Sequence, residues 1–166
     1  IGVTPVALLV THGHVDHVSA LGPVAKALQP EAIAVHEADA SRLSAAPDMA
    51  RMFGLKTERP PKATLLLDDG DTLQVGALQF KTLHTPGHTP GGVCFLLEEQ
   101  KVLFCGDTLF YRGIGRTDLP GGSFADLSRS IRTKIYALDG AIRVYPGHGP
   151  PTTIHDEMFS NPFVTL

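Results

Sequence analysis

The chain has 166 residues with 14 Lys+Arg, 17 Asp+Glu, 8 His, 2 Cys and no Trp, which fits a single domain over residues 1–166 that needs no disulfides to fold. Its 43% hydrophobic and 19% charged content excludes disorder. A net charge of −3 and the lack of a long apolar run give no reason to expect nucleic acid or a membrane as partner. The scarcity of cysteine, with only Cys94 and Cys105, predicts a reducing compartment such as the cytoplasm.

The first half of the chain predicts strands alternating with helices. A wholly apolar run at 6–11 indicates a buried strand, and apolar residues at helical spacing predict a helix over 18–29. A second buried strand is expected at 32–36. The next helix is expected over 37–46, closed by Pro47 because proline disrupts a helix interior.

The second half is predicted to be richer in strands. Strand-like segments separated by turn signals lie at 64–67, 72–75, 77–83, 92–98 and 101–105. They predict an antiparallel run with hairpins. An amphipathic helix is then expected over 124–138, a strand over 141–145 and a short helix over 152–159. Mixed strands with helices at both ends predict an α/β fold with two packed sheets and outer helices.

The strongest chemical signal is the segment Thr11-His-Gly-His-Val-Asp-His17, which follows the first predicted strand. His12 and His14 are expected to project to the same side, because extended backbone has a period of two. Asp16 and His17, after the turn, can face a second point nearby. Neutral imidazoles and a carboxylate are ligands that suit zinc, iron or manganese.

Three further segments carry histidine or aspartate in loops rich in glycine and proline. They are His84-Thr-Pro-Gly-His-Thr-Pro-Gly-Gly92, Cys105-Gly-Asp-Thr-Leu-Phe110 and Tyr145-Pro-Gly-His-Gly-Pro150. Taken singly, Asp107 is equally consistent with a turn cap, and His88 or His148 with an ordinary loop histidine. Together with the first motif they supply five His and two Asp, enough for two ions that share a carboxylate.

These motifs, in this order, resemble those of the metallo-β-lactamase superfamily, and most of all its glyoxalase II (hydroxyacylglutathione hydrolase) branch. The segments Gly115-Arg-Thr-Asp-Leu-Pro-Gly-Gly122 and Asn161-Pro-Phe163 are similar to small, single-domain bacterial members of that branch. The resemblance implies an αββα sandwich with metals at one edge between the sheets. It also implies that the chain lacks N-terminal strands, since family members carry further strands before the first one seen here.

The resemblance also implies a metal site and a reaction. One ion would be held by His12, His14 and His88, the other by Asp16, His17 and His148, with Asp107 between them. The ions would be two divalent metals, zinc first, with iron or manganese as alternatives. The implied reaction is hydrolysis of a small, glutathione-derived thioester through a metal-bridging hydroxide that Asp16 helps to orient.

Two other functions stay open at this point. A mononuclear iron persulfide dioxygenase would use two histidines and one carboxylate of the same set, and the segment 115–118 resembles that class. An inactive metal-binding fragment is the other alternative. Arg116 is a candidate for binding a substrate carboxylate, although an ion pair with Asp118 is favoured. Tyr111 is a candidate for lining the pocket, with packing as the equal alternative. Cys105 is expected to be a small buried apolar residue.

Overall fold

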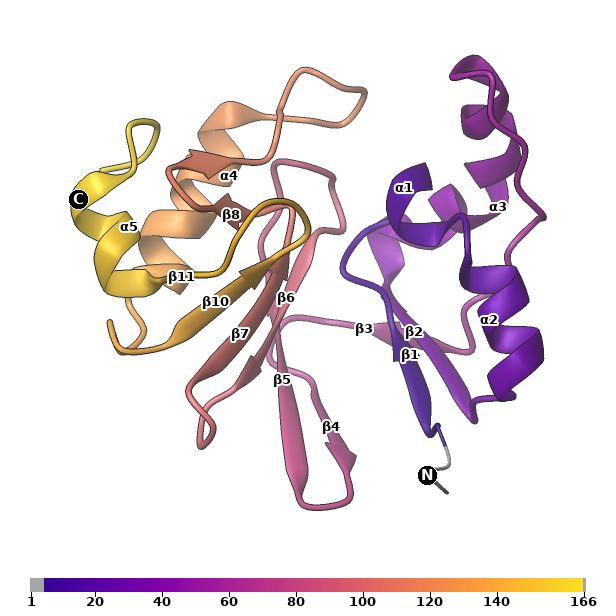
Figure 1. Cartoon of the computed structure of the whole chain (residues 1–166), viewed down its shortest axis with the longest axis horizontal. Helices are drawn as coiled ribbons and strands as arrows, with labels where there is room; N and C mark the ends of the chain where they lie inside the picture. The colour runs from indigo at the N-terminus through magenta and orange to yellow at the C-terminus, as the bar shows by residue number, and fades with distance from the viewer. Residues whose placement is uncertain (1–4, 166) are drawn as a thin grey trace.

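Two β-sheets lie face to face in the computed structural model, which describes residues 5–165 (Figure 1). The smaller sheet is parallel, with the order β1 (Ala7–Leu9), β2 (Ala32–His36) and β3 (Leu65–Leu67). The larger sheet has the order β11 (Thr152–Thr153), β10 (Arg143–Pro146), β7 (Val102–Gly106), β6 (Val93–Leu97), β5 (Leu78–His84) and β4 (Thr72–Val75). A short separate pair is formed by β8 (Leu109–Phe110) and β9 (Gly113–Ile114).

Helices cover the outer face of each sheet (Figure 1). The smaller sheet is covered by α1 (Val15–Val18), α2 (Leu21–Leu28) and α3 (Glu37–Met52). The larger sheet is covered by α4 (Phe124–Ser130), the π-helical turn η1 (Ile131–Ile135) and α5 (Ile154–Ser160). The layers therefore follow the order αββα, which confirms the α/β sandwich predicted from the sequence.

Three clusters of buried apolar side chains hold the layers together. The largest lies between the larger sheet and its helices and includes Leu96, Leu103 and Leu127. A second joins the smaller sheet to α1–α3, and a third, with Val93 and Phe95, lies between the two sheets. Each fully buried leucine contributes about 1.5–3 kcal/mol, so these clusters fix the sheet edge from which the polar loops emerge.

The predicted helix over 18–29 was wrong at its start, because the motif segment itself turns helical. His14 is extended, with φ −73° and ψ 150°, and α1 begins at the next residue. Val15 and Val18, three positions apart, are both buried, so packing holds this single turn against the fold. Ser19 and Ala20 separate it from α2.

The prediction that Pro47 closes the next helix was also wrong. Helix α3 continues through Pro47 to Met52. Leu43, Ala46 and Ala50 lie at helical spacing on both sides of the proline and are almost fully buried. Their burial outweighs the cost of about 3 kcal/mol that a proline imposes on a helix interior.

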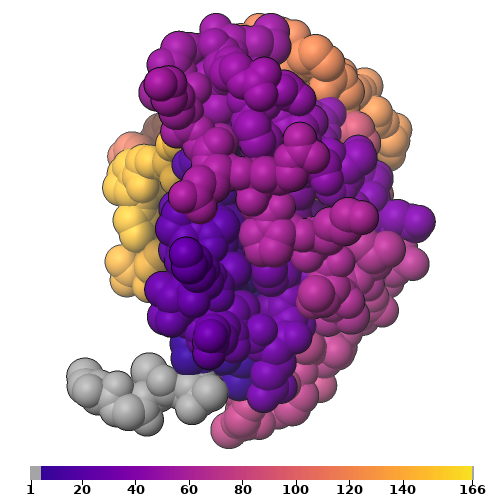
Figure 2. All heavy atoms as spheres, turned by 90° about the vertical axis from the view of Figure 1, so that its right-hand side faces the viewer, coloured from indigo at the N-terminus to yellow at the C-terminus, as the bar shows by residue number. Residues whose placement is uncertain are grey.

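The segment 64–67 was predicted to belong to the antiparallel run, but its strand β3 pairs in parallel with β2. The connection that makes this possible is α3 followed by residues 53–64, which cross the outer surface of this half of the molecule (Figures 1 and 2). Parallel neighbours require such a crossover. The rest of the run, β4 to β7, is antiparallel as predicted.

The remaining differences concern the short strands β8 and β9, which the sequence analysis did not predict, and element ends. The helix expected over 124–138 is α4 continued by η1 and ends at Ile135, and Thr152 and Thr153 form a strand instead of beginning the last helix. Among residues 5–165, no helix is both long enough and apolar enough to cross a membrane.

Candidate metal centre

The loops that carry the predicted site residues leave the sheets at one edge. Strands β5 and β7 both run antiparallel to β6, and β10 runs parallel to β7. The carboxyl ends of β5, β7 and β10 therefore point the same way. His88 follows β5, Asp107 follows β7 and His148 follows β10, while the segment after β1 brings the other four residues to the same place.

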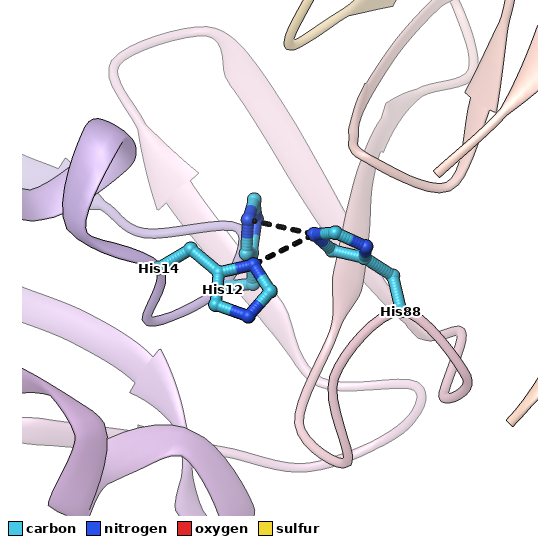
Figure 3. A group of neighbouring side chains, drawn as sticks. All are labelled: His12, His14 and His88. Carbon is cyan, nitrogen blue, oxygen red and sulfur yellow. Dashed lines mark hydrogen bonds between the residues drawn. The ribbon is translucent and has the colours of Figure 1, made fainter. Parts of the chain in front are cut away.

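Three buried imidazoles converge on one point (Figure 3). The Nε2 atom of His88 lies 2.8 Å from Nδ1 of His14 and 3.3 Å from Nε2 of His12. Nδ1 of His88 lies 2.7 Å from the carbonyl oxygen of Arg116, so that nitrogen carries the proton and donates. The remaining lone pair of His88 therefore points at the other two rings, which is the orientation a metal-binding histidine needs.

Burial keeps two of these rings neutral. Desolvation, together with the neighbouring histidines, lowers the pKa of His12 far below its ordinary value. Desolvation, followed by the influence of His88 and Arg42, lowers the pKa of His14 from 6.5 to about 4. Neutral imidazole is the form that coordinates metal ions, so both rings are ready to bind a cation at neutral pH.

A second group of donors lies beside the first and is more open to solvent. Nε2 of His148 is 3.0 Å from Oδ2 of Asp16 and 3.3 Å from Nε2 of His17. The Asp16 and His148 side chains are 53% and 55% exposed, whereas that of His17 is 16% exposed. This group of donors is therefore accessible from solvent.

Asp107 lies between the two groups. Its Oδ1 is 3.3 Å from Nε2 of His17, and its Oδ2 is 3.5 Å from Nε2 of both His88 and His148. Oδ1 is buried, and among the described residues it receives no hydrogen bond of good geometry. A buried carboxylate oxygen without a donor is costly, and a bound cation would remove that cost.

The electrostatics around Asp107 are those of an anion among imidazoles. Burial alone would raise the pKa of Asp107, but the facing His17, His88 and His148 outweigh it and lower this pKa. Burial likewise opposes protonation of His17, and the facing Asp107 carboxylate nevertheless raises the pKa of that ring. The backbone at Gly147 makes room for this contact, since a Cβ there would collide with Oδ1 of Asp107 and the ring of His17.

The donor set fits divalent cations. Three sets of three residues each offer donor atoms that lie within 4.8 Å of one another: His12, His14 and His88; His12, His17 and Asp107; Asp16, His17 and His148. Imidazole nitrogens and carboxylate oxygens are ligands for zinc, iron and manganese. All seven predicted residues are thus brought together, and Asp107 lies close to members of both donor groups.

The sequence analysis missed Asp39, which supports the site from α3. It is fully buried, its Oδ2 accepts the N–H of Gly13 at 2.8 Å, and its Oδ1 accepts the N–H of Gly91 at 2.9 Å. Gly13 lies between His12 and His14, and Gly91 lies three residues after His88, so one carboxylate joins the two loops. An aspartate within the buried stripe of a predicted helix is the signal that was available in the sequence.

The weaker predictions had mixed outcomes. Arg116 forms a two-pronged ion pair with Asp118, with both N···O distances 2.8 Å, as favoured from the sequence. Tyr111 is 52% exposed and lies beside Arg112, outside the cavity described next. Cys105 is fully buried, and burial raises its pKa well above the usual value, which agrees with an inert packing role.

A cavity of about 680 Å³ opens onto the cluster. Its lining includes five residues of the cluster, His14, Asp16, His88, Asp107 and His148. Its walls come from the end of α3 and the residues after it, from β8 and β9, and from the loop before α4. This volume lies within the usual range of small-molecule sites.

An αββα sandwich with a partly buried cluster of histidines and aspartates at one sheet edge defines a metallo-hydrolase fold. The model of the metallo-beta-lactamase superfamily matches residues 2–148, and the chain belongs to this superfamily. The fold implies divalent metal ions at the His/Asp cluster.

Relatives and solved structures place the chain within the superfamily. It is 42% identical to "Hydroxyacylglutathione hydrolase GloC" of Haemophilus influenzae over 95% of this chain and 74% of that protein. The structure of TTHA1623 in a di-iron-bound form is 39% identical, with a TM-score of 0.88 over 96% of this chain and 78% of that one. BLEG-1 B3 metallo-beta-lactamase is also 39% identical, with a TM-score of 0.90 over 99% of this chain and 79% of that one.

Proposed function

We propose that this chain is a dinuclear metal-dependent thioester hydrolase acting on S-acylglutathione-type substrates. The observation that carries the proposal is the position of Asp107, whose carboxylate oxygens lie 3.3–3.5 Å from His88 of the first donor group and from His17 and His148 of the second. A carboxylate in that position suits two cations, one held with His12, His14 and His88 and the other with Asp16, His17 and His148. The name of the Haemophilus relative, a hydroxyacylglutathione hydrolase, supports a thioester as the substrate.

Divalent cations bound there would supply Lewis acidity and a hydroxide nucleophile at neutral pH. The chain's own residues supply position and proton handling. Asp16, which lines the cavity, would orient the attacking water and accept the proton that the water releases as it becomes the hydroxide nucleophile. His88, held through its Nδ1 by the Arg116 carbonyl, keeps a fixed ring orientation throughout the reaction.

The leaving group of a thioester needs little acid catalysis from the protein. A thiol has a pKa near 8.5, so a thiolate departs without a strong general acid. This matches the cavity, whose only lysine or arginine side chains are Arg42 and Arg116 among the described residues. Both of them are engaged with aspartates.

A two-metal hydrolase and a mononuclear iron dioxygenase differ in stoichiometry and in product. The proposal predicts two metal ions per chain by mass spectrometry and hydrolysis of S-lactoylglutathione by the zinc-, iron- or manganese-loaded protein. Oxygen uptake with glutathione persulfide and one iron per chain would instead support the dioxygenase. Because BLEG-1 is described as a B3 metallo-beta-lactamase, a chromogenic β-lactam serves as the comparison substrate. Fully metallated protein that hydrolyses no thioester would refute the proposal.

A further inference from the structure

We infer that the cavity beside the metal cluster selects thioesters whose acyl group is an extended apolar chain, with the charged thiol carrier left toward solvent. This inference rests on the proposed thioester hydrolysis and identifies the acyl chain as the part of the substrate that the cavity recognises. It is argued from the lining side chains, from the pairing of the nearby arginines and from the exposure of the donors.

The walls of the cavity are apolar. Met49 and Met52 from α3 are joined by Phe53 and Leu55 just after it. Of these, Met52, Phe53 and Leu55 are 84%, 63% and 56% exposed. Large apolar side chains gathered on the rim of a concave site mark a binding surface.

The opposite wall is also apolar. Phe110 and Ile114 come from β8 and β9, and Leu119 and Pro120 come from the loop before α4. Figure 1 shows the end of α3 and this loop rising on opposite sides of the same edge. A ligand that reaches the cluster between them would therefore contact hydrocarbon on both sides.

The two arginines of the cavity are already occupied. Nε of Arg42 lies 3.3 Å from Oδ1 of Asp39, and its Nη2 donates to the carbonyl of Pro120 at 2.8 Å. Arg116 is held by both oxygens of Asp118. Binding of a glutathione carboxylate by either guanidinium would compete with these existing partners, so the cavity offers no unpaired cationic side chain for the charged carrier.

These facts give the substrate an orientation. The glutathione moiety carries charges that an apolar wall would have to strip of water at a high cost, so the acyl chain is the part that fits inside. The side chains of Asp16 and His148 are about half exposed, so the thiol carrier can extend from the metal cluster into solvent. Methionine side chains adapt to ligands of different shape, so the wall suits a range of chain lengths.

The test is a chain-length series on the zinc-loaded full chain. Acetyl, butanoyl, hexanoyl and octanoyl thioesters of glutathione are compared by kcat/KM, and the matching S-alkyl glutathione thioethers, which cannot be hydrolysed, are compared by calorimetric affinity. Both quantities should rise with length, by up to about fourfold for each methylene that becomes buried.

Two matched variants test whether the dependence on chain length arises from the apolar wall of the cavity. Phe53→Ser should lower the octanoyl-to-acetyl ratio of kcat/KM by about tenfold. Phe159→Ser is the control, because Phe159 has a similar exposure of 67% but lies on α5, away from the cavity. It should leave the ratio unchanged.

The outcomes separate this inference from the proposed function. Hydrolysis of all thioesters with no dependence on chain length would overturn the inference and leave the hydrolase standing. No hydrolysis, but thioether binding that tightens with length and weakens in Phe53→Ser, would overturn the hydrolase and keep the apolar ligand class. Loss of both activity and length-dependent binding would overturn both.

Discussion

Replacement of Asp39 tests whether one buried carboxylate holds the metal centre together. Its two oxygens accept the backbone N–H groups of Gly13 and Gly91, at 2.8 and 2.9 Å. These glycines belong to the loops that carry His12, His14 and His88. Without the carboxylate, both donors would remain buried with no acceptor.

The expected loss of stability follows from the two backbone N–H donors that Asp39 satisfies. Each buried N–H left without a partner costs about 1–3 kcal/mol, so Asp39→Ala should lower the free energy of unfolding by about 4 kcal/mol. Asp39→Asn keeps one carbonyl oxygen and can satisfy only one donor, so its loss should be about 2 kcal/mol. Because the loops carry the ligands, zinc affinity should fall by about 10–100-fold.

The assay combines urea unfolding of the metal-free protein with zinc competition against a chelator. Asp48→Ala is the matched control, since Asp48 lies on the same helix but pairs with Arg51 at the surface, with its side chain 66% exposed. It should change stability by less than about 1 kcal/mol. If Asp39→Ala equals this control in stability and keeps the original zinc affinity, the argument that Asp39 joins the loops is refuted.

Three other measurements probe the site and the core. Asp107→Asn removes the charge that faces His88 of the first donor group and His17 and His148 of the second, so metal content by mass spectrometry should fall below two ions per chain, and unchanged content would contradict the bridging role. Burial lowers the pKa of His14 from 6.5 to about 4. Between these two pH values the unfolded chain binds a proton on this ring that the folded chain does not bind. The free energy of unfolding of the metal-free protein should therefore fall by roughly 3 kcal/mol as the pH falls from 6.5 to 4. Urea unfolding at several pH values should show a shallower decline for His14→Gln, and equal slopes would count against the assignment. Leu103→Ala in the fully buried core of the larger sheet should lower the free energy of unfolding by about 2–5 kcal/mol, with a loss below 1 kcal/mol arguing against tight packing there.

Some features were predictable because they depend on neighbours in sequence. The period-two spacing of His12 and His14, and the glycine, proline, histidine and aspartate residues that follow three later strands, predict a candidate site without any knowledge of distance. The turn signals likewise predict the antiparallel strands β4 to β7. In each case the relevant residues lie within one short segment, so local chemistry is sufficient.

The errors arose where packing overrides local preference. Pro47 is a helix breaker by itself, yet Leu43 and Ala50 are buried on either side of it and keep α3 continuous. The strand β3 was assigned to the wrong partner because pairing direction depends on where the chain returns after a long connection. Asp39 escaped notice because its partners, Gly13 and Gly91, lie 26 and 52 residues away.

Taken alone, the sequence determined the types of donor atom, their order along the chain and the layered class of the fold. Only the tertiary structure decided that Asp107 faces both donor groups, that Arg42 and Arg116 are already paired, and that apolar side chains line the approach to the cluster. The reason is physical: donor chemistry belongs to each side chain, whereas distance, burial and pairing arise only when segments far apart in the chain pack against one another.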